Sequence, residues 1–384
     1  MISNDIRCIG VNDHDIDLFE GQYTVPNGMS YNSYVIIDEK IAVMDTVDQR
    51  FTGEWLNRLD QALCGRQPDY LVVHHMEPDH SSSILAFLDR YPAAIIVSSA
   101  KAFAIMKNFF GTDFADRRLV IAEGAALNLG KHDLTFVLAP MIHWPEVFMT
   151  YDKHEKALFS ADAFGKFGAL DVQDDWACEA RRYYFGIVGK YGAQVQALLK
   201  KAAALQIDAI CPLHGPVLSE NLETYLNLYD TWSSYRAESA GIVIAYASMY
   251  GNTKKGALLL AQRLEEKGAG KVSLFDLARD DMAEAVEDAF RYDRLVLAAP
   301  TYNAGVFPVM REFIHHLTER NYQGRTVALM ENGSWAPVAA KTMRTMLEGC
   351  KNLAFAENTV KILSALSEDS KAQIEALADE LCRG

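Results

Sequence analysis

The sequence lacks several patterns that define whole classes of protein. Its six cysteines stand singly, and no Cys-x-x-Cys pair is present that could hold a rubredoxin-type iron, a zinc ribbon or an iron–sulfur cluster. No cluster of Lys and Arg occurs, and the net charge of −14 disfavours a nucleic-acid surface, because phosphate binding needs a basic stripe. No Gly-x-Gly-x-x-Gly motif follows a predicted strand, which disfavours direct binding of NAD.

Long hydrophobic runs are missing as well. Segments such as 93–97 and 295–299 are far too short to cross a bilayer. Residues 1–17 are rich in Asp and Asn and have no apolar region of the kind found in signal peptides. Isolated cysteines suit a reducing compartment. We therefore expect a cytoplasmic protein with no membrane segment and no nucleic-acid partner.

The length of 384 residues suits two domains, and the composition, 50% hydrophobic and 23% charged, is globular. The first part of the chain is β-rich with interspersed helices. From Gly241 the pattern changes to strict alternation of strand and helix, which is typical of a parallel, doubly wound sheet. Because residues 231–240 are polar with few apolar anchors, we expect the domains to span 1–238 and 241–384.

Short apolar runs and helical spacing locate the expected elements. In the first domain a helix is expected over Trp55–Ala62, and Ser81 to Ser83 offer caps for another through Leu88. The predicted strands there are Tyr34–Ile37, Ile41–Asp45, Tyr70–Val73, Ala94–Ser98, Leu134–Leu138, Ala157–Ser160 and Ala209–Cys211. In the second domain they are Ile242–Ala247, Val272–Phe275, Leu295–Ala299, Thr326–Met330 and Thr359–Ile362, separated by helices such as Lys254–Glu266 and Pro308–Arg320.

A dense group of potential metal ligands follows the predicted strand Tyr70–Val73. His75-x-Glu77-x-Asp79-His80 packs four potential ligands into six residues. If the chain stays extended, alternation places His75, Glu77 and Asp79 on one side of it. A single histidine after a strand is usually structural, but four potential ligands in six residues predict a metal site.

Three further candidates stand at the ends of other predicted strands, where loops gather. They are His143, Asp162 and His214. Each taken alone is as compatible with a structural role as with metal binding. His74 is expected to point away from its neighbour and to be structural, and five other histidines show no partner pattern, namely His14, His132, His154, His315 and His316.

A candidate phosphate loop follows the first strand of the second domain and opens a helix. Its residues are Ser248, Met249, Tyr250, Gly251, Asn252 and Thr253. Backbone N–H groups and hydroxyls at a helix N-terminus can hold a phosphate without Lys or Arg. The segment resembles the flavodoxin phosphate loop, which implies contacts from Ser248, Tyr250, Asn252 and Thr253.

Two more loops leave the carboxyl ends of predicted strands, where a doubly wound sheet binds its ligand. They contain Pro300, Thr301, Tyr302, Asn303 and Ala304, and Asn332, Gly333, Ser334 and Trp335. Tyr302 and Trp335 could flank the isoalloxazine ring of a flavin, or could simply cover their loops.

The metal-ligand pattern resembles the metallo-β-lactamase fold, in which a His-x-His-x-Asp-His motif, a later His, a bridging Asp and a final His hold two metals. Glu77 stands where the zinc enzymes carry their second His. Four imidazoles and three carboxylates form a harder, more anionic site than five imidazoles, and such a site suits iron better than zinc. Two ferrous ions, three carboxylates and a bridging hydroxide also balance in charge.

With a flavodoxin module after it, the whole chain resembles the flavodiiron protein family, and the match includes Tyr31-Asn32-Ser33-Tyr34 and His143-Trp144-Pro145. The resemblance implies an α/β and α+β chain. An N-terminal metallo-β-lactamase-like αββα sandwich is followed by a flavodoxin-like doubly wound parallel five-stranded sheet. It assigns His75, Glu77 and His143 to one iron, Asp79, His80 and His214 to the other, and Asp162 to both. The implied cofactors are two non-haem irons and flavin mononucleotide (FMN), and the implied reaction is reduction of dioxygen to water, of nitric oxide to nitrous oxide, or of both.

The same resemblance places Glu20 and Tyr184 in the pocket, and Glu20 departs from the His of many relatives, which puts proton delivery and the preferred gas in doubt. It also implies a separate electron donor, of rubredoxin type, with a deazaflavin or another reductase as alternatives. A head-to-tail homodimer, or a dimer of such dimers, would bring the flavin of one subunit to the irons of the other. Two rival functions are a zinc hydrolase with an accessory flavodoxin module, which Glu77 disfavours, and a non-catalytic electron carrier, which the complete ligand set disfavours.

Overall fold

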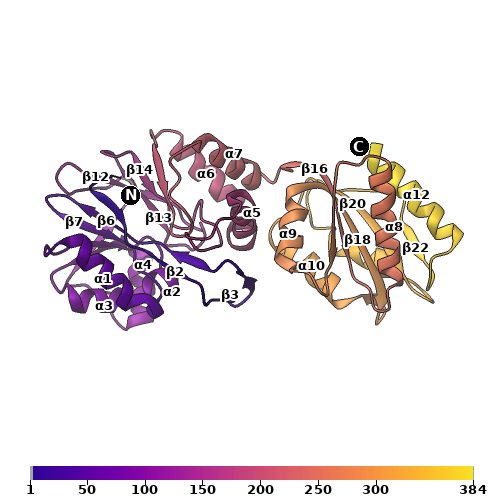
Figure 1. The fold of residues 1–384 in the computed structure, drawn as a ribbon, viewed down its shortest axis with the longest axis horizontal. Helices are drawn as coiled ribbons and strands as arrows, with labels where there is room; N and C mark the ends of the chain where they lie inside the picture. The colour runs from indigo at the N-terminus through magenta and orange to yellow at the C-terminus, as the bar shows by residue number, and fades with distance from the viewer. Residues whose placement is uncertain (1–2, 384) are drawn as a thin grey trace. The chain divides into compact units, whose positions relative to one another are not determined.

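The computed structural model describes residues 3–383. The chain forms two compact units, Met1–Asp230 and Thr231–Gly384, each with its own sheet structure and hydrophobic core (Figure 1). Within residues 3–383 no helix combines the length and the apolar character needed to span a bilayer.

The first unit contains two large sheets. The first has the strand order β1-β6-β7-β8-β9-β10, with antiparallel pairing from β1 to β7 and parallel pairing from β7 to β10. Helices connect the parallel strands, as such crossovers require. The strands are β1 (Ile6–Cys8), β6 (Tyr34–Ile37), β7 (Ile41–Met44), β8 (Tyr70–Val72), β9 (Ile95–Ser99) and β10 (Arg118–Ile121), and the helices are α1 (Thr52–Leu63), α2 (Pro78–Ser81), α3 (Ile84–Arg90) and α4 (Ala100–Phe110).

The second sheet has the order β11-β12-β13-β14-β15, and its last pair is parallel. Two small ribbons, β2 with β5 and β3 with β4, complete the strand pairing described for this unit. The strands are β11 (Ala126–Asn128), β12 (Asp133–Leu138), β13 (Phe148–Asp152), β14 (Ala157–Phe159), β15 (Ala209–Cys211), β2 (Val11–Asp13), β5 (Met29–Tyr31), β3 (Leu18–Phe19) and β4 (Tyr23–Thr24). The helices are α5 (Trp176–Tyr183), α6 (Gly192–Ala202) and α7 (Leu222–Ser233).

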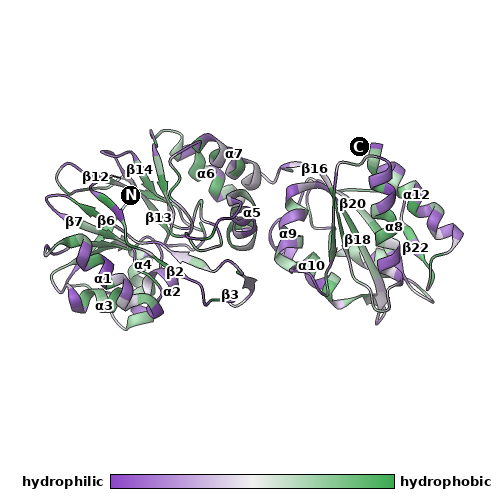
Figure 2. Ribbon diagram, in the orientation of Figure 1, coloured by the Kyte–Doolittle hydropathy of each residue, from purple (hydrophilic) through white to green (hydrophobic). Residues whose placement is uncertain are grey.

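The core of this unit lies between the two sheets. Buried side chains from both, such as Ile36 and Val72 from the first and Phe136 and Phe159 from the second, form one cluster. Figure 2 shows the strands as largely hydrophobic and the helices with mixed faces. In α1, for example, Trp55, Leu59 and Leu63 recur at helical spacing and are buried. The arrangement confirms the predicted metallo-β-lactamase-like sandwich.

Local sequence accounts for most but not all of these elements. The predicted strand Tyr34–Ile37 agrees with β6, whereas β13 was not predicted because its sequence, Phe-Met-Thr-Tyr-Asp, shows no alternation and all five residues are buried. The helix predicted through Leu88 after the capping serines is α3, with Ser83 at its N-cap. A separate short helix that was not predicted, α2, precedes it and begins at Pro78, because proline is pre-set for the first helical position.

The second unit contains a parallel sheet with the order β17-β16-β18-β20, continued by β21 and β22 beside β20. This is the 2-1-3-4-5 order of flavodoxin-like folds, as predicted. The strands are β16 (Ser239–Tyr246), β17 (Lys271–Asp276), β18 (Tyr292–Tyr302), β19 (Gly305–Val306), β20 (Thr326–Asn332), β21 (Ala354–Phe355) and β22 (Val360–Ile362). The helices are α8 (Asn252–Glu266), α9 (Met282–Arg291), α10 (Pro308–Glu319), α11 (Ala339–Met346) and α12 (Glu368–Arg383).

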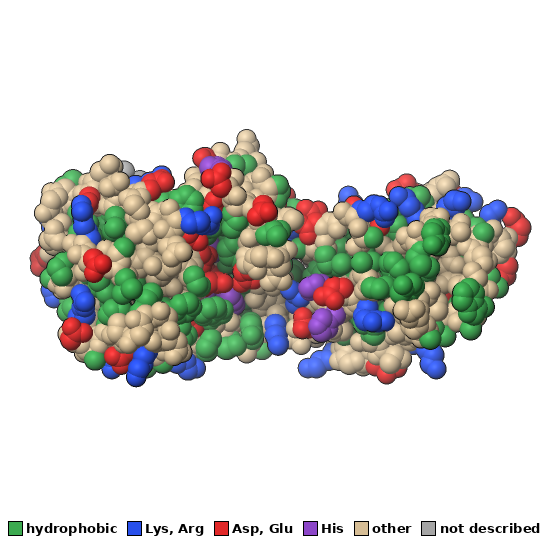
Figure 3. All heavy atoms as spheres, turned by 90° about the horizontal axis from the view of Figure 1, so that it is seen from below, with side chains coloured by type: hydrophobic (Ala, Val, Ile, Leu, Met, Phe, Trp, Pro, Cys, Tyr) green, Lys and Arg blue, Asp and Glu red, His purple; other side chains and the backbone are tan. Residues whose placement is uncertain are grey.

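The surface carries charges of both signs. On the face drawn in Figure 3, acidic and basic side chains are interspersed on each unit and are not gathered by sign. Hydrophobic side chains, uncharged polar side chains and backbone cover much of the rest of this face.

Candidate functional site

Four side chains of the first unit converge on one point. His75 Nε2, His143 Nε2, Glu77 Oε2 and Asp162 Oδ2 lie between 3.1 and 3.3 Å from one another in the pairs measured, and one ligand atom of each lies within 4.8 Å of the others. All but Glu77 are buried. Separations of this size are those of ligand atoms around a single metal ion, since donors about 2 Å from an ion lie roughly 3 Å apart.

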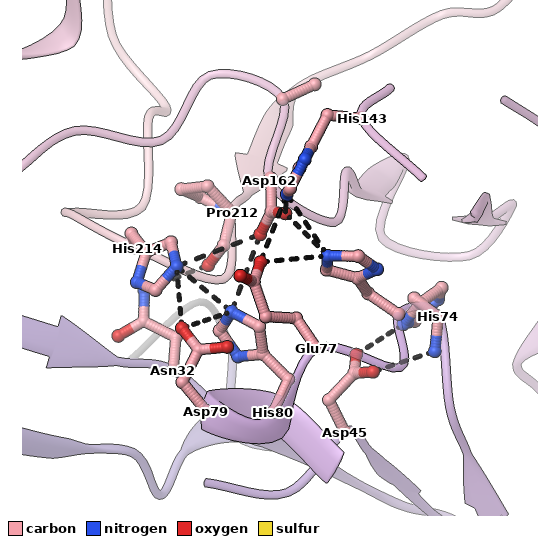
Figure 4. A network of polar contacts seen from close by, with 12 residues as sticks. Asn32, Asp45, His74, Glu77, Asp79, His80, His143, Asp162, Pro212 and His214 are labelled. Carbon is pink, nitrogen blue, oxygen red and sulfur yellow. Dashed lines mark hydrogen bonds and ion pairs between the residues drawn. The ribbon is translucent and has the colours of Figure 1, made fainter. Parts of the chain in front are cut away.

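A second group lies on the other side of Asp162. His80 Nε2 and His214 Nε2 are 3.0 Å apart, and each is 3.3 Å from Asp79 Oδ2. Asp162 Oδ1 lies 3.4 Å from His80 Nε2 and 3.8 Å from His214 Nε2. Figure 4 shows these rings and carboxylates pointing toward one another. One carboxylate therefore presents one oxygen to each group.

The backbone explains why neighbouring residues serve different groups. The chain remains extended through Glu77, and Pro78 then starts α2, so Asp79 and His80 lie on a helical turn. The expectation that His75, Glu77 and Asp79 share one side of an extended chain is therefore wrong for Asp79, because the sequence argument carried the strand past the proline. His143, Asp162 and His214 come from the loops after β12, β14 and β15.

Hydrogen bonds to the far side of two rings fix their tautomers. His214 Nδ1 donates to the Ser30 carbonyl at 2.7 Å, and this leaves Nε2 free to act as a ligand. His75 Nδ1 lies 2.9 Å from Glu146 Oε1, which also accepts from the Met76 backbone N–H at 3.0 Å. Buried Glu146 was not predicted, although it stands three residues after His143. Such outer partners orient a ligand and raise its basicity.

The charges of the site oppose one another strongly. Burial alone would raise the pKa of Glu77 and lower that of His75. Hydrogen bonds from His143 and His75 nevertheless place the pKa of Glu77 well below its usual range, and Asp162 raises the pKa of His75 well above its own. Burial lowers the pKa of His143 and Asp162 raises it, and the resulting pKa is about 9. The three carboxylates thus create a field that favours positive charge at this point.

Buried oxygen atoms in the site fit a bound cation. Both oxygens of Asp79 and both of Asp162 lack a hydrogen-bond partner within the described residues. Buried polar atoms of this kind need a partner. Four imidazoles and three carboxylates arranged in two groups supply the donors for two metal ions, and the residues present therefore fit a dinuclear centre.

Residues near the two groups include some that were predicted and some that were not. Glu20 lies in the loop between β3 and β4; desolvation and the nearby Glu77 charge raise the pKa of Glu20 to about 7. Tyr184 has ring contacts with Phe185 and Tyr229, and its neighbour Tyr183 has its ring 5.5 Å from that of His214. The place of Tyr184 in the pocket stays a prediction.

His74 is held by its own partners. Its Nδ1 lies 2.5 Å from Asp45 Oδ2 and its Nε2 lies 2.7 Å from Thr150 Oγ1, and all three side chains are buried. Figure 4 shows this pair to one side of the converging ligands. His74 is thus a structural residue, as its position in the sequence suggested.

The second unit has an open cavity of about 440 Å³ at the carboxyl ends of its central strands. Its walls come from the loops after β16, β18 and β20, where a doubly wound sheet binds its ligand, and from Ser364 after β22. The lining residues are Ser248, Met249, Tyr250, Asn252, Thr253, Pro300, Thr301, Asn303, Ala304, Asn332, Gly333, Ser334, Trp335, Ala336 and Ser364. Ala336 and Ser364 were not predicted, whereas predicted Gly251 and Tyr302 are not among the lining residues.

The loop after β16 has the features of a phosphate site. Gly251 has φ 89°, its N–H donates to Ser248 Oγ at 3.1 Å, and Asn252 begins the 15-residue helix α8. The first N–H groups of such a helix favour an anion. Tyr250 in this loop and Trp335 in the loop after β20 are 94% and 83% exposed, which suits their rings to cover a planar ligand.

Comparisons with known proteins agree with both units. Residues 29–215 match the family described as "ODP family beta lactamase", and residues 243–355 match the family described as "Flavodoxin domain". The nitric oxide reductase of Moorella thermoacetica is 29% identical over 93% of this chain and 91% of its own length.

Two solved structures share the complete fold. The flavodiiron protein of Giardia intestinalis has a TM-score of 0.92 and 25% identity, covering 99% of this chain and 95% of its own. The rubredoxin oxygen:oxidoreductase of Desulfovibrio gigas has a TM-score of 0.93 and 24% identity, covering 100% of this chain and 97% of its own.

Together, the fold and the two sites define a metallo-β-lactamase-like domain followed by a flavodoxin-like domain. The chain belongs to the flavodiiron protein family and is an oxidoreductase. The family and its flavodoxin-like domain imply FMN and a non-haem diiron pair as cofactors.

Proposed function

We propose that the protein reduces dioxygen to water, nitric oxide to nitrous oxide, or both, at a diiron pair that FMN re-reduces. The observation that carries the proposal is the position of Asp162, whose two oxygens face two separate groups of imidazoles. The relative named nitric oxide reductase supports nitric oxide as a substrate. The fold shared with the rubredoxin oxygen:oxidoreductase supports dioxygen as the alternative.

The proposed ligands of one iron are His75, Glu77 and His143, and those of the other are Asp79, His80 and His214, with Asp162 between them. Glu77 supports iron over zinc because it adds a hard, anionic donor where a zinc hydrolase carries an imidazole. The hydrogen bonds from His75 to Glu146 and from His214 to Ser30 would hold both rings in place before metal binds. Glu20 and Tyr184 are proposed to line the same pocket.

In the second unit, the helix α8 N-terminus with Ser248, Asn252 and Thr253 would hold the FMN phosphate, and Trp335 would lie against the ring system. Two ferrous ions together supply two electrons, and a reduced flavin supplies two more. Dioxygen needs four electrons and four protons to form two waters, whereas two nitric oxide molecules need two electrons and two protons to form nitrous oxide and water. Because the irons alone can supply the two electrons for nitric oxide, a flavin close to the irons would matter most for the reduction of dioxygen.

A composition measurement separates this proposal from a zinc hydrolase. Protein produced with iron and zinc both available is expected to hold about two irons and one FMN per chain, and to consume dioxygen or nitric oxide when a rubredoxin-type donor reduces it. Ester hydrolysis by a protein with stoichiometric zinc would contradict the proposal. A protein that binds iron and FMN but consumes neither gas would instead be an electron carrier.

We further propose a cytoplasmic homodimer, or a dimer of dimers, in which the flavin of one subunit serves the irons of its partner. Co-expression of two inactive variants tests this. One is His75→Ala, and the other combines Asn252→Ala with Thr253→Ala. A mixed dimer then contains one intact flavin facing one intact metal site, and activity should reappear. Mixed dimers as inactive as either parent would exclude transfer between subunits.

A further inference from the structure

A third group of metal-ligating side chains lies elsewhere in the first unit. Asp5, His132, His154 and Glu155 each place one ligand atom within 4.8 Å of the others. His132 immediately precedes β12, His154 and Glu155 form the turn between β13 and β14, and Asp5 immediately precedes β1. The two histidines showed no partner pattern in the sequence, and the fold brings them together with ring centroids 4.9 Å apart.

The group is distant from the proposed diiron ligands. It lies where β12 begins and β13 ends, whereas His143 follows the opposite end of β12. A six-residue strand spans roughly 17 Å. The third group therefore occupies the other end of the same sheet, and neither set shares a residue with the other.

The environment of the His132 side chain indicates a bound ligand. It is fully buried, and its Nε2 has no hydrogen-bond partner in the part of the chain that the structure describes. Its Nδ1 lies 2.8 Å from Asp152 Oδ2, so the ring donates from Nδ1, and in the neutral ring the Nε2 lone pair faces the cluster. Nε2 faces Asp5 Oδ2 at 3.6 Å.

Asp152 orients three members of the group at once. This buried carboxylate holds the His132 ring, and it also accepts from the backbone N–H groups of His154 at 3.2 Å and Glu155 at 3.3 Å. A carboxylate behind a histidine ligand is the usual outer partner in metal sites. The arrangement is thus organised before any ion arrives.

The donor set selects a class of ion. Two imidazoles and two carboxylates suit a borderline divalent ion such as Zn²⁺, whose tetrahedral ligands lie about 3.3 Å apart. Two carboxylates also balance the charge of a divalent ion. Lys131 competes with the ion for Asp5, because its Nζ forms an ion pair with the same Asp5 oxygen that faces His132.

We propose that Asp5, His132, His154 and Glu155 form a third metal site, which binds a zinc-class divalent ion and fastens the segment before β1 to the second sheet. Its role is structural. The ion would connect the start of one sheet of the sandwich to the turn between two strands of the other.

The test uses iron-loaded, FMN-loaded protein in a Zn²⁺ buffer, with zinc and iron both counted after desalting. Wild type should hold one zinc beyond its irons. His154→Ala and Glu155→Gln, both at positions with partial or full solvent exposure, should lose it, with Kd raised about 100-fold or more. Iron, FMN and gas reduction should not change. His14→Ala is the control, because His14 is an exposed histidine of the same unit paired with Asp171.

Lys131→Met separates a metal site from a simple ion-pair cluster. Removing the competitor frees the Asp5 oxygen from a largely exposed ion pair, and zinc should then bind about two- to fivefold more tightly. Zinc should raise the melting temperature of wild type and of Lys131→Met but not of His154→Ala. The proposal is overturned if wild type takes up no zinc beyond its iron sites, if His154→Ala binds as much as the His14→Ala control, or if Lys131→Met does not strengthen binding.

Discussion

The metal centre and the flavin cavity are built by opposite strategies. The proposed iron ligands come from positions 75–214, are nearly all buried, and are held from behind by residues such as Glu146 and Ser30. The cavity of the second unit is open, and its walls are loops at the carboxyl ends of neighbouring strands β16, β18 and β20, with Ser364 added from after β22. A buried centre depends on the identity and protonation of each side chain. An open cavity depends more on backbone conformation.

The largest expected effect tests side-chain identity at the metal centre. Glu77→His exchanges a carboxylate for an imidazole and reduces the negative charge of the site, so zinc occupancy should rise at the expense of iron. We expect gas reduction to fall to background while FMN binding remains at wild-type level. Metal analysis and gas-consumption assays measure both changes.

A matched substitution guards against a general effect of the new histidine. Glu123→His alters a surface carboxylate paired with Lys201 and should leave metal content and turnover unchanged. If Glu77→His keeps two irons and wild-type turnover, the argument from ligand hardness fails.

The next largest effect is expected when side chains are removed from the flavin loop. Asn252→Ala combined with Thr253→Ala deletes two expected contacts to a charged phosphate, each worth about 1.5–3 kcal/mol, so the Kd for FMN should rise roughly 100-fold or more. Iron content should not change. The control is Lys254→Ala with Lys255→Ala, which removes two exposed cations from the same helix. An equal loss of FMN in the control would mean that lysine charge, and not the loop, binds the phosphate.

Sequence alone predicted the parts of both sites that sit on recognisable spacing. His75-x-Glu77-x-Asp79-His80 indicated metal, and the strand–loop–helix around Gly251 indicated a phosphate, because each pattern is local. The alternation argument failed at Asp79, since the chain turns into α2 at Pro78. The overall fold followed from the resemblance and from strand–helix alternation, and the unpredicted strand β13 lacked any period to detect.

Residues that act through tertiary contacts left no such signal. Glu146 Oε1 lies 2.9 Å from His75 Nδ1, although the two residues are 71 positions apart in the sequence. Ser364, which follows β22, lines the flavin cavity. The same reason explains why Asp5, His132 and His154 looked unrelated: the fold joins the start of β1 to the turn before β14.

A smaller effect tests the support behind the metal ligands. Glu146→Gln keeps an acceptor for His75 Nδ1 and Met76 N–H but removes the charge. We expect iron affinity at the His75 position to fall by about 10- to 100-fold, with FMN unaffected. Anaerobic iron titration against a chelator measures it, with Glu123→Gln as the surface control. Unchanged iron affinity would show that Glu146 serves only packing.

The smallest effect isolates backbone conformation at the flavin loop. Gly251 has φ 89° and open space where a Cβ would stand, so Gly251→Ala introduces strain without a clash. A left-handed non-glycine residue costs about 1–2 kcal/mol. Gly268 is the matched control, because it lies at the other end of α8 with φ 75° and equally open space. Both alanine variants should lose similar stability to urea, but only Gly251→Ala should weaken FMN binding, by about tenfold. If both variants weaken FMN equally, the loop conformation is not what binds the phosphate, and the contrast between a side-chain site and a backbone site does not hold.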